Sequence, residues 1–187
     1  MKKILLIFSL LSLALTGLAQ TVEYTLRYNI ALSRYEAYGR PNFTQSQYNW
    51  GSAQVSVVTP TSVANSAFTI NSVAAGGWVD NSQIYGVQNL DFHAVGSNGL
   101  KVDLVSGQET LLFTFVLPGG VCTPGLRLFV NGSDPNSSAA GMQGGDFANT
   151  MYSANDILGG TNLYLQNYAN TGTVCTTCNL TAPTLSK

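Results

Sequence analysis

The stretch that decides the fold is residues 89–131, NLDFHAVGSNGLKVDLVSGQETLLFTFVLPGGVCTPGLRLFVN. Apolar and polar residues alternate through Leu90–Val95 and Leu100–Leu104, and again from Glu109 to Leu117. Ser97-Asn98-Gly99 and Ser106-Gly107 separate these runs. Such alternation, bounded by Gly, Ser and Asn, is typical of antiparallel strands with one buried face. The stretch therefore predicts consecutive strands of a meander.

Further strands are expected on both sides of this stretch. Residues 21–28 alternate apolar with polar side chains and residues 34–38 return along them, which predicts a hairpin. Residues 39–50 are expected to form a loop, and Gly76-Gly77 a bulge or tight turn. Shorter strands are expected at 53–58, which Pro60 ends, and at 67–70, 126–130 and 158–165.

Eight or nine short strands without an amphipathic helix predict an all-β fold. We expect an antiparallel β-sandwich of cohesin, immunoglobulin or jelly-roll type, with a closed barrel as the alternative. Residues 132–156 lack sustained periodicity, so a long loop with a helical turn near 146–152 is expected there. Loops on a rigid sandwich commonly carry recognition, which makes 132–156 and the turn at 76–81 candidate binding surfaces.

The N-terminus has the features of a secretory signal peptide. Lys2 and Lys3 precede an apolar run, Ile4–Leu15, and small residues before Gln20 predict cleavage after Ala19. The run is shorter than the about 20 residues of a membrane helix, so no membrane insertion is expected after cleavage. The expected segments are a signal peptide at 1–19, a β-sandwich at 20–170 and a Cys- and Thr-rich tail at 171–187. The protein is expected to be secreted, on the cell surface, or in the periplasm.

Charge excludes one class of partner. Cleavage would remove Lys2 and Lys3, which leaves six of the eight Lys and Arg residues against nine Asp and Glu residues. The remaining basic residues form no cluster in the sequence, so no electrostatic footprint for nucleic acid is present. Aromatic residues make up 10% of the chain and charged residues only 9%, which favours a folded domain over a disordered segment.

Three cysteines, Cys122, Cys175 and Cys178, lie in a chain expected to reach an oxidising compartment. A bond from Cys122 to either Cys175 or Cys178 would join the tail to the predicted meander and contribute about 4 kcal/mol in the chain-entropy description. The remaining cysteine would be free or would pair with another molecule. The Cys175-Thr176-Thr177-Cys178 spacing matches a redox motif, but the βαβ context of such motifs is absent.

Aromatic residues suggest a ligand platform. Trp50 and Trp78, together with some of the nine tyrosines, could stack against sugars, with Asp80 and Asn81 beside Trp78 adding polar contacts. The alternative is that both tryptophans belong to the core or to a sheet edge.

Oxygen-bearing side chains in the long loop suggest a calcium site. Asp134, Asn136 and Asp146, with Ser138, supply the hard ligands that calcium binds. Turn capping by Asp and Asn explains the same residues, and the segment lacks the spaced acids of a calcium loop. No other cofactor is expected.

Catalysis finds little support. His93, the single histidine, is out of phase with Phe92 and is expected to be an exposed strand residue. Asp91, Asp103 and Glu109 could form a glycosidase pair, but acids on neighbouring strands are commonly solvated. No catalytic residue is therefore expected.

Three stretches resemble a known family: the hairpin Tyr24–Tyr38, the segment Gly51–Val55 with its Pro60 stop, and above all Cys122–Pro135. They resemble the N-terminal module of secreted, adhesin-like surface proteins of Bacteroidota that are associated with gliding motility and type IX secretion. The resemblance implies a cohesin-like or carbohydrate-binding-type β-sandwich and no catalytic residue.

These observations favour an exported, non-enzymatic binding or adhesion module that recognises a carbohydrate or another surface protein. A structural subunit, in which strand edges and the spare cysteine join copies, is the alternative. A secreted glycoside hydrolase is least favoured.

Overall fold

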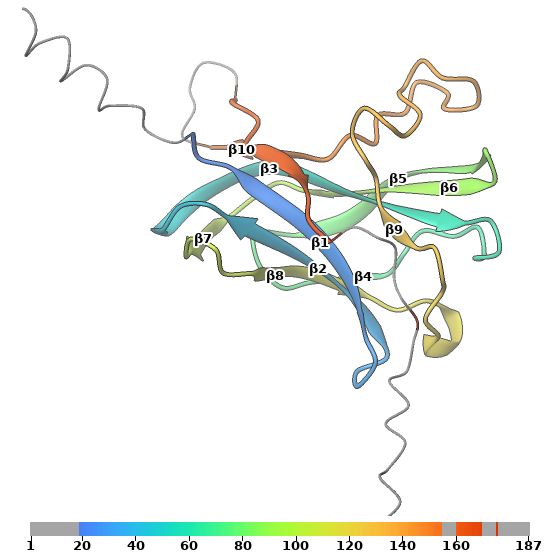
Figure 1. The fold of residues 1–187 in the computed structure, drawn as a ribbon, viewed down its shortest axis with the longest axis horizontal. Coiled ribbons are helices and arrows are strands. Elements are labelled where there is room, and N and C mark those ends of the chain that lie inside the picture. Colours follow the sequence, from blue (N-terminus) through green and yellow to red (C-terminus); the bar gives the residue numbers. More distant parts are fainter. Residues whose placement is uncertain (1–18, 155–159, 170–174, 176–187) are drawn as a thin grey trace, which may run out of the picture.

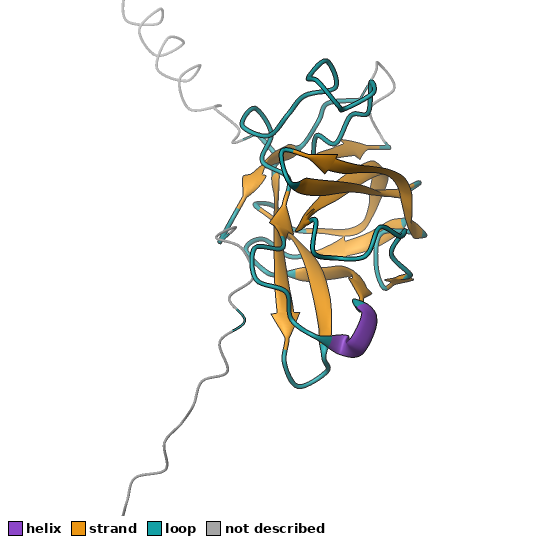
Figure 2. Ribbon diagram, turned by 90° about the vertical axis from the view of Figure 1, so that its right-hand side faces the viewer, coloured by secondary structure: helices purple, strands orange, loops and turns teal. Residues whose placement is uncertain are grey.

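The structure, a computed structural model, describes residues 19–154, 160–169 and 175 (Figure 1). Within these residues the chain forms eleven strands and a 3-10 turn, η1 (Pro118–Gly120). Apart from that turn, the described chain in Figure 2 consists of strands and loops, which confirms the all-β prediction. None of the helices in these ranges has the length and apolar character needed to cross a membrane.

The first sheet has the strand order β11-β1-β2-β8-β4. Its members are β1 (Val22–Asn29), β2 (Arg34–Pro41), β4 (Ile70–Ser72), β8 (Thr110–Phe115) and β11 (Tyr164–Asn167). β1 and β2 pair antiparallel along their whole length, which confirms the predicted hairpin. β11 lies parallel to β1 at the edge of the sheet, so the end of the described chain returns to its beginning.

The second sheet has the order β10-β3-β6-β5, and β7 and β9 also pair with β3. Its members are β3 (Gln45–Pro60), β5 (Trp78–Val87), β6 (Leu90–Ser97), β7 (Lys101–Leu104), β9 (Arg127–Leu128) and β10 (Thr150–Ser153). The long β3 pairs with β7 through its first part and with β6 through its second. The two sheets form a sandwich, as expected, rather than a closed barrel.

The predicted meander is wrong. β6 pairs with β3 and β5, β7 pairs with β3, and β8 pairs with β2 and β4 in the other sheet. The strands β6, β7 and β8 are consecutive in the sequence but do not pair with one another. Alternation identifies the buried side of a strand but carries no information about which strand lies beside it.

Three segments also differ from expectation. The loop expected at 39–50 is largely strand, because β2 continues to Pro41 and β3 begins at Gln45. The Gly76-Gly77 pair suggests a break, yet the turn immediately precedes the long strand β5, which the sequence pattern does not predict. β10 lies where the sequence predicts a helical turn. β5 and β10 together raise the strand count from nine to eleven.

The core between the sheets is rich in aromatic side chains. Its largest members include Tyr24, Tyr35, Trp50, Trp78, Phe113 and Phe115. Val55 and Val57 of β3 and Val95 of β6 face the same interior. These inner residues follow the period of two that the sequence shows, so each strand buries one side between the sheets.

A second, smaller cluster covers the outer side of the second sheet. Phe129, which follows β9, and Met142 and Phe147 of the long loop pack with Val58 and Phe92 of the sheet. Figure 1 shows this loop, in orange, beside β5, β6 and β9. Met142 and Phe147 therefore anchor part of the expected recognition loop to the sheet, while the other residues of 132–148 are exposed or only partly buried.

Asn149 fixes the end of this loop. Its fully buried amide accepts a hydrogen bond from the Ser56 N–H at 2.7 Å and donates one to the Phe129 carbonyl at 2.7 Å. Asn131 adds a reciprocal pair, since its side chain accepts from the Asn149 N–H and donates to the Asn149 carbonyl. The hydrogen bonds of the Asn131 and Asn149 side chains thus hold the end of the loop in place where it has no strand pairing.

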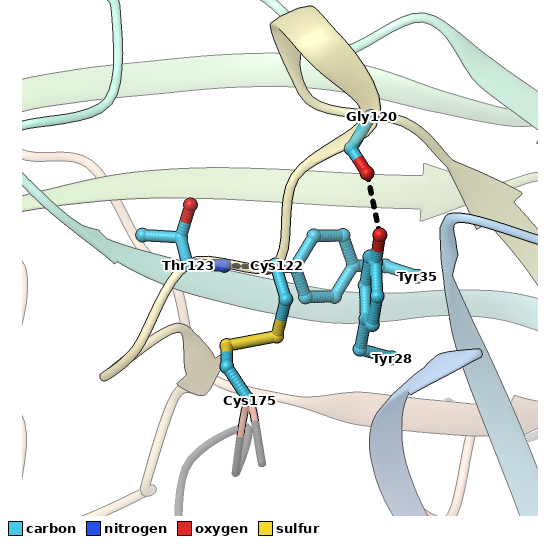
Figure 3. Close-up of a disulfide and its surroundings, with 6 residues drawn as sticks. All are labelled: Tyr28, Tyr35, Gly120, Cys122, Thr123 and Cys175. Carbon is cyan, nitrogen blue, oxygen red and sulfur yellow. Dashed lines mark hydrogen bonds between the residues drawn. A yellow bond between two sulfur atoms is a disulfide. The ribbon is translucent and has the colours of Figure 1, made fainter. Parts of the chain in front are cut away.

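A disulfide joins Cys122 to Cys175 (Figure 3). Beside it, the Thr123 N–H donates to the Tyr35 hydroxyl at 2.6 Å, and the Tyr28 hydroxyl donates to the Gly120 carbonyl. The predicted bond from Cys122 is thereby confirmed, with Cys175 as the partner. Cys178 lies outside the described residues, as does the predicted signal peptide up to residue 18.

Candidate functional site

The residues expected to bind a ligand lie mostly inside the protein. Trp50 and Trp78 are each 2% exposed and belong to the core, so neither ring can stack against a ligand at the surface. Asp80 is also buried, and its Oδ2 accepts the Phe68 N–H at 2.7 Å. Asn81 is exposed. The structure thus does not bring these four residues together as a surface platform.

His93 is buried, which contradicts the expected exposed position. Its Nδ1 lies 2.8 Å from Asp80 Oδ2, and both side chains are 1% exposed. The His93 ring stacks on Phe68 at 3.8 Å between centroids. The phase of His93 is correct, but the side of β6 that carries it faces the interior of the sandwich.

The residues proposed for calcium each cap local backbone. Asp134 forms a two-pronged ion pair with Arg127 and accepts the Val130 N–H at 2.7 Å. Asn136 accepts from the Ser138 N–H, and Asp146 from the Ala148 N–H. Among the described residues, no group of three or more His, Cys, Asp or Glu side chains could hold a metal ion. The turn-capping alternative accounts for all three contacts.

A different surface gathers polar and aromatic side chains. We call it the tyrosine–arginine face, the outer side of the first sheet. It consists of Glu23, Arg27, Glu36, Tyr38, Arg40, Glu109, Gln166 and Tyr168. The opposite sides of β1 and β2 supply core residues, so period-two alternation sends these polar side chains outward. Thr25, on the same side of β1, is fully buried, which indicates that the larger side chains cover the sheet closely.

Arginine and tyrosine are stacked twice on this face. The Arg27 guanidinium lies 4.8 Å from the centre of the Tyr38 ring, and the Arg40 guanidinium lies 3.9 Å from that of Tyr168. Arg27 also pairs with Glu109, and Tyr168 donates its hydroxyl hydrogen to the same carboxylate at 2.8 Å. Each stack is held by a cation–π contact, and the shared Glu109 carboxylate links the two stacks.

A second carboxylate joins three strands. Glu23 on β1 accepts from Arg40 on β2 at 2.6 Å and from the Gln166 amide on β11 at 2.7 Å. Further along β2, the Glu36 carboxylate accepts from Arg34 and Tyr38. The side chains are thus held in fixed positions by one another before any ligand arrives.

These contacts stabilise the ionised carboxylates. Hydrogen bonds from Gln166 to Glu23 and from Arg27 to Glu109 lower the pKa of each carboxyl below its usual value. Burial raises the pKa of Glu36, but hydrogen bonds from Tyr38 and Arg34 outweigh it and lower the pKa overall. Because the pKa of each carboxyl is lower in the folded than in the unfolded protein, the ionised carboxylate stabilises the fold. This stabilisation is complete above the unfolded pKa near 4.5 and is lost as the pH falls through the folded pKa.

The phenol of Tyr38 is expected to ionise late in an alkaline titration. Burial and the hydrogen bond to Glu36 raise its pKa from 10.0 to about 12. Because the folded value exceeds the unfolded one, the stability that this neutral phenol contributes is complete below pH 10 and is lost as the pH rises through about 12. Ultraviolet difference titration should show a tyrosinate step near pH 12 that Tyr38→Phe removes and Glu36→Gln moves to lower pH. An unchanged titration curve in both variants would contradict this assignment.

Two hollows adjoin the face. One, of about 430 Å³, is lined by Asn131, Tyr164, Gln166 and Asn167 along β11. The other, of about 280 Å³, is lined by Glu23, Arg40, Asn42 and Ser106 at the far end of β2. Gln166 lines the first hollow and Glu23 lines the second, and these two side chains are hydrogen-bonded to each other.

Sequence reasoning finds only part of this face. The alternation of residues 21–28 places Glu23 and Arg27 on one side of a strand, and that signal is visible in the sequence. Tyr38 belongs to the return strand of the predicted hairpin. Tyr168 and Gln166 carry no usable signal, because a single short strand near the end of the chain does not reveal that it pairs with β1.

The fold and this surface define an all-β sandwich domain with an internal disulfide and a preorganised polar outer face. Comparisons with known protein families, with curated proteins and with solved structures found no match. The resemblance to surface modules of Bacteroidota therefore stays a prediction.

Proposed function

We propose that the protein is an exported, non-enzymatic binding or adhesion module that holds a carbohydrate on the tyrosine–arginine face. The observation that carries this proposal is the gathering of two tyrosine–arginine stacks and their carboxylates on the outer side of one sheet. Tyr and Arg are among the residue types most enriched where proteins bind their partners tightly. The N-terminal sequence and the Cys122–Cys175 bond support export, because disulfides persist in oxidising compartments.

Unused hydrogen-bonding groups on this face suit a sugar. Both donors to Glu109 reach Oε1, which leaves Oε2 to accept from a ligand. Arg27 contacts Glu109 through Nη2 and its side chain is 48% exposed, so its other N–H groups can donate. Sugar hydroxyls both donate and accept, and their ring faces are apolar enough to lie against tyrosine. Carboxylate, guanidinium and aromatic ring are therefore offered side by side.

The same geometry argues for binding without hydrolysis. A glycosidase needs one carboxylic acid whose pKa is raised so that it can protonate the leaving group. On this face the pKa of Glu23, Glu36 and Glu109 is lowered in each case. Asp103, another acid of the candidate glycosidase pair, also has a lowered pKa, because the Gln47 N–H and the Ser46 hydroxyl donate to it. These carboxylates are suited to accepting hydrogen bonds.

The direct test is a glycan array probed with the protein and with surface variants. We expect selective retention that Tyr168→Ala and Arg27→Ala each weaken about tenfold or more, since hydrogen bonds to charged groups contribute about 1.5–3 kcal/mol. Tyr152→Ala is the matched control, because this partly exposed tyrosine lies on β10, outside the face.

Circular dichroism of each variant separates a binding defect from misfolding. If glycan binding is unchanged in both Tyr168→Ala and Arg27→Ala, the ligand binds outside the tyrosine–arginine face. The same conclusion follows if Tyr152→Ala weakens glycan binding as much as these two changes do. Retention of no glycan at all would contradict the carbohydrate form of the proposal.

A further inference from the structure

We infer that the ligand is an electrically neutral polysaccharide, bound through an internal segment of its chain across strands β11, β1 and β2. This inference rests on the proposed function, because it names the ligand class and path at the same face. Two features carry it: the charge balance of the face and the position of the two hollows.

Each arginine of the face already has a carboxylate partner, as does the neighbouring Arg34. Arg27 pairs with Glu109, Arg34 with Glu36 and Arg40 with Glu23. Binding an anionic polysaccharide would require a carboxylate or sulfate to compete with these partners, and the three glutamates would repel it. A neutral sugar can use the remaining donor and acceptor sites without breaking any pair. The charge balance therefore favours neutral over acidic chains.

The hollows define a path across the sheet. Gln166 lines one hollow, Glu23 and Arg40 line the other, and the Gln166–Glu23 hydrogen bond lies where they approach each other. Three adjacent strands span roughly 10 Å, since neighbours lie about 4.8 Å apart. The Asn131 and Asn42 amides line one hollow each, and both already bond to backbone, which leaves each a second N–H and a second lone pair for a ligand. A polymer can thus contact both hollows and the connecting residues at once.

Such a path binds chain interiors rather than chain ends. The face is the outer side of an open sheet, and neither hollow is a closed pocket that would receive a terminal sugar. A ligand that spans both hollows makes contacts in proportion to its length, so affinity should rise with the number of sugar units and should not depend on the reducing end.

The experiment compares soluble neutral polysaccharides, a xyloglucan and a galactomannan, with acidic ones, alginate and chondroitin sulfate. Affinity electrophoresis at low and high salt is expected to show retardation by a neutral chain that changes less than about twofold with salt, because no net charge is engaged. Reducing the terminal sugar of a bound oligosaccharide to its alditol should leave calorimetric affinity unchanged. Gln166→Ala should weaken polysaccharide binding about tenfold.

Each other outcome is decisive. Preferred binding of alginate or chondroitin sulfate that salt removes would overturn the neutral-chain inference while leaving a carbohydrate function standing. Loss of affinity on alditol formation would overturn the internal-segment path. If no polysaccharide or array glycan is retained, the proposed function itself fails, and the two failures are thereby distinguished.

Discussion

Trp78→Ala is expected to destabilise the domain by about 3–5 kcal/mol, the usual cost of truncating a buried tryptophan. The ring is 2% exposed and lies against Phe113 at 5.2 Å between centroids. Its Nε1–H donates to the Ala74 carbonyl at 2.7 Å, so truncation both opens a cavity and leaves a carbonyl without its donor. Urea unfolding followed by circular dichroism measures the loss.

The second tryptophan provides a matched comparison. Trp50 is equally buried, but its Nε1 has no hydrogen-bond partner among the described residues. Trp50→Phe therefore removes volume and an unpaired N–H, whereas Trp78→Phe removes volume and a hydrogen-bonded N–H. We expect the Trp78 change to cost about 1 kcal/mol more. If Trp78→Ala unfolds at the same urea concentration as the wild type but no longer binds glycan, the stability prediction is wrong and Trp78 belongs to the ligand site.

These tryptophans illustrate where sequence reasoning stops. The pattern around Gly76-Gly77 suggests a break, and a tryptophan at a break is easily assigned to a surface platform. In the structure the glycine turn precedes β5, and the first residue of that strand points into the core. The turn is predicted correctly from local sequence, whereas the strand after it forms only through pairing with a distant part of the chain.

The same limit explains the meander and the face. The sequence of β6, β7 and β8 predicts each strand and its buried side, yet β8 crosses to the other sheet. Likewise Glu23 and Arg27 are recognisably outward, while Gln166 reaches Glu23, 143 residues away in the chain, only because β11 pairs with β1. Local alternation predicts strands well, and the assembly of a site from distant strands lies beyond it.

His93 shows the limit within a single residue. Its alternation phase places it on the same side of β6 as Val95, which belongs to the core. A lone histidine beside an aspartate suggests a solvated position, but the acid that it meets is Asp80 from the neighbouring strand β5. The Asp80–His93 contact follows from the register between β5 and β6, which the sequence alone does not give.

Asp80→Ala is expected to cost about 2–6 kcal/mol, because two buried polar groups lose their partner, at about 1–3 kcal/mol for each. The carboxylate serves two groups at once, since Oδ2 accepts the Phe68 N–H at 2.7 Å and lies 2.8 Å from His93 Nδ1. Truncation leaves the Phe68 N–H without its acceptor and the His93 nitrogen without its partner, in a site where Phe68 stacks on the histidine ring and water has little access. Thermal and urea unfolding should report the loss, and binding by the remaining folded protein should be unchanged because the tyrosine–arginine face lies on the other sheet.

A double-mutant cycle separates the pair from the backbone contact. His93→Phe keeps an aromatic ring against Phe68 but removes the nitrogen that faces Asp80. If the two side chains stabilise each other, Asp80→Ala with His93→Phe should be less destabilising than the sum of the single changes by about 1–3 kcal/mol. The remaining cost of the double variant then measures the Phe68 N–H left unpaired. Additive single effects would mean that Asp80 acts on the Phe68 backbone alone and that the histidine is held by stacking.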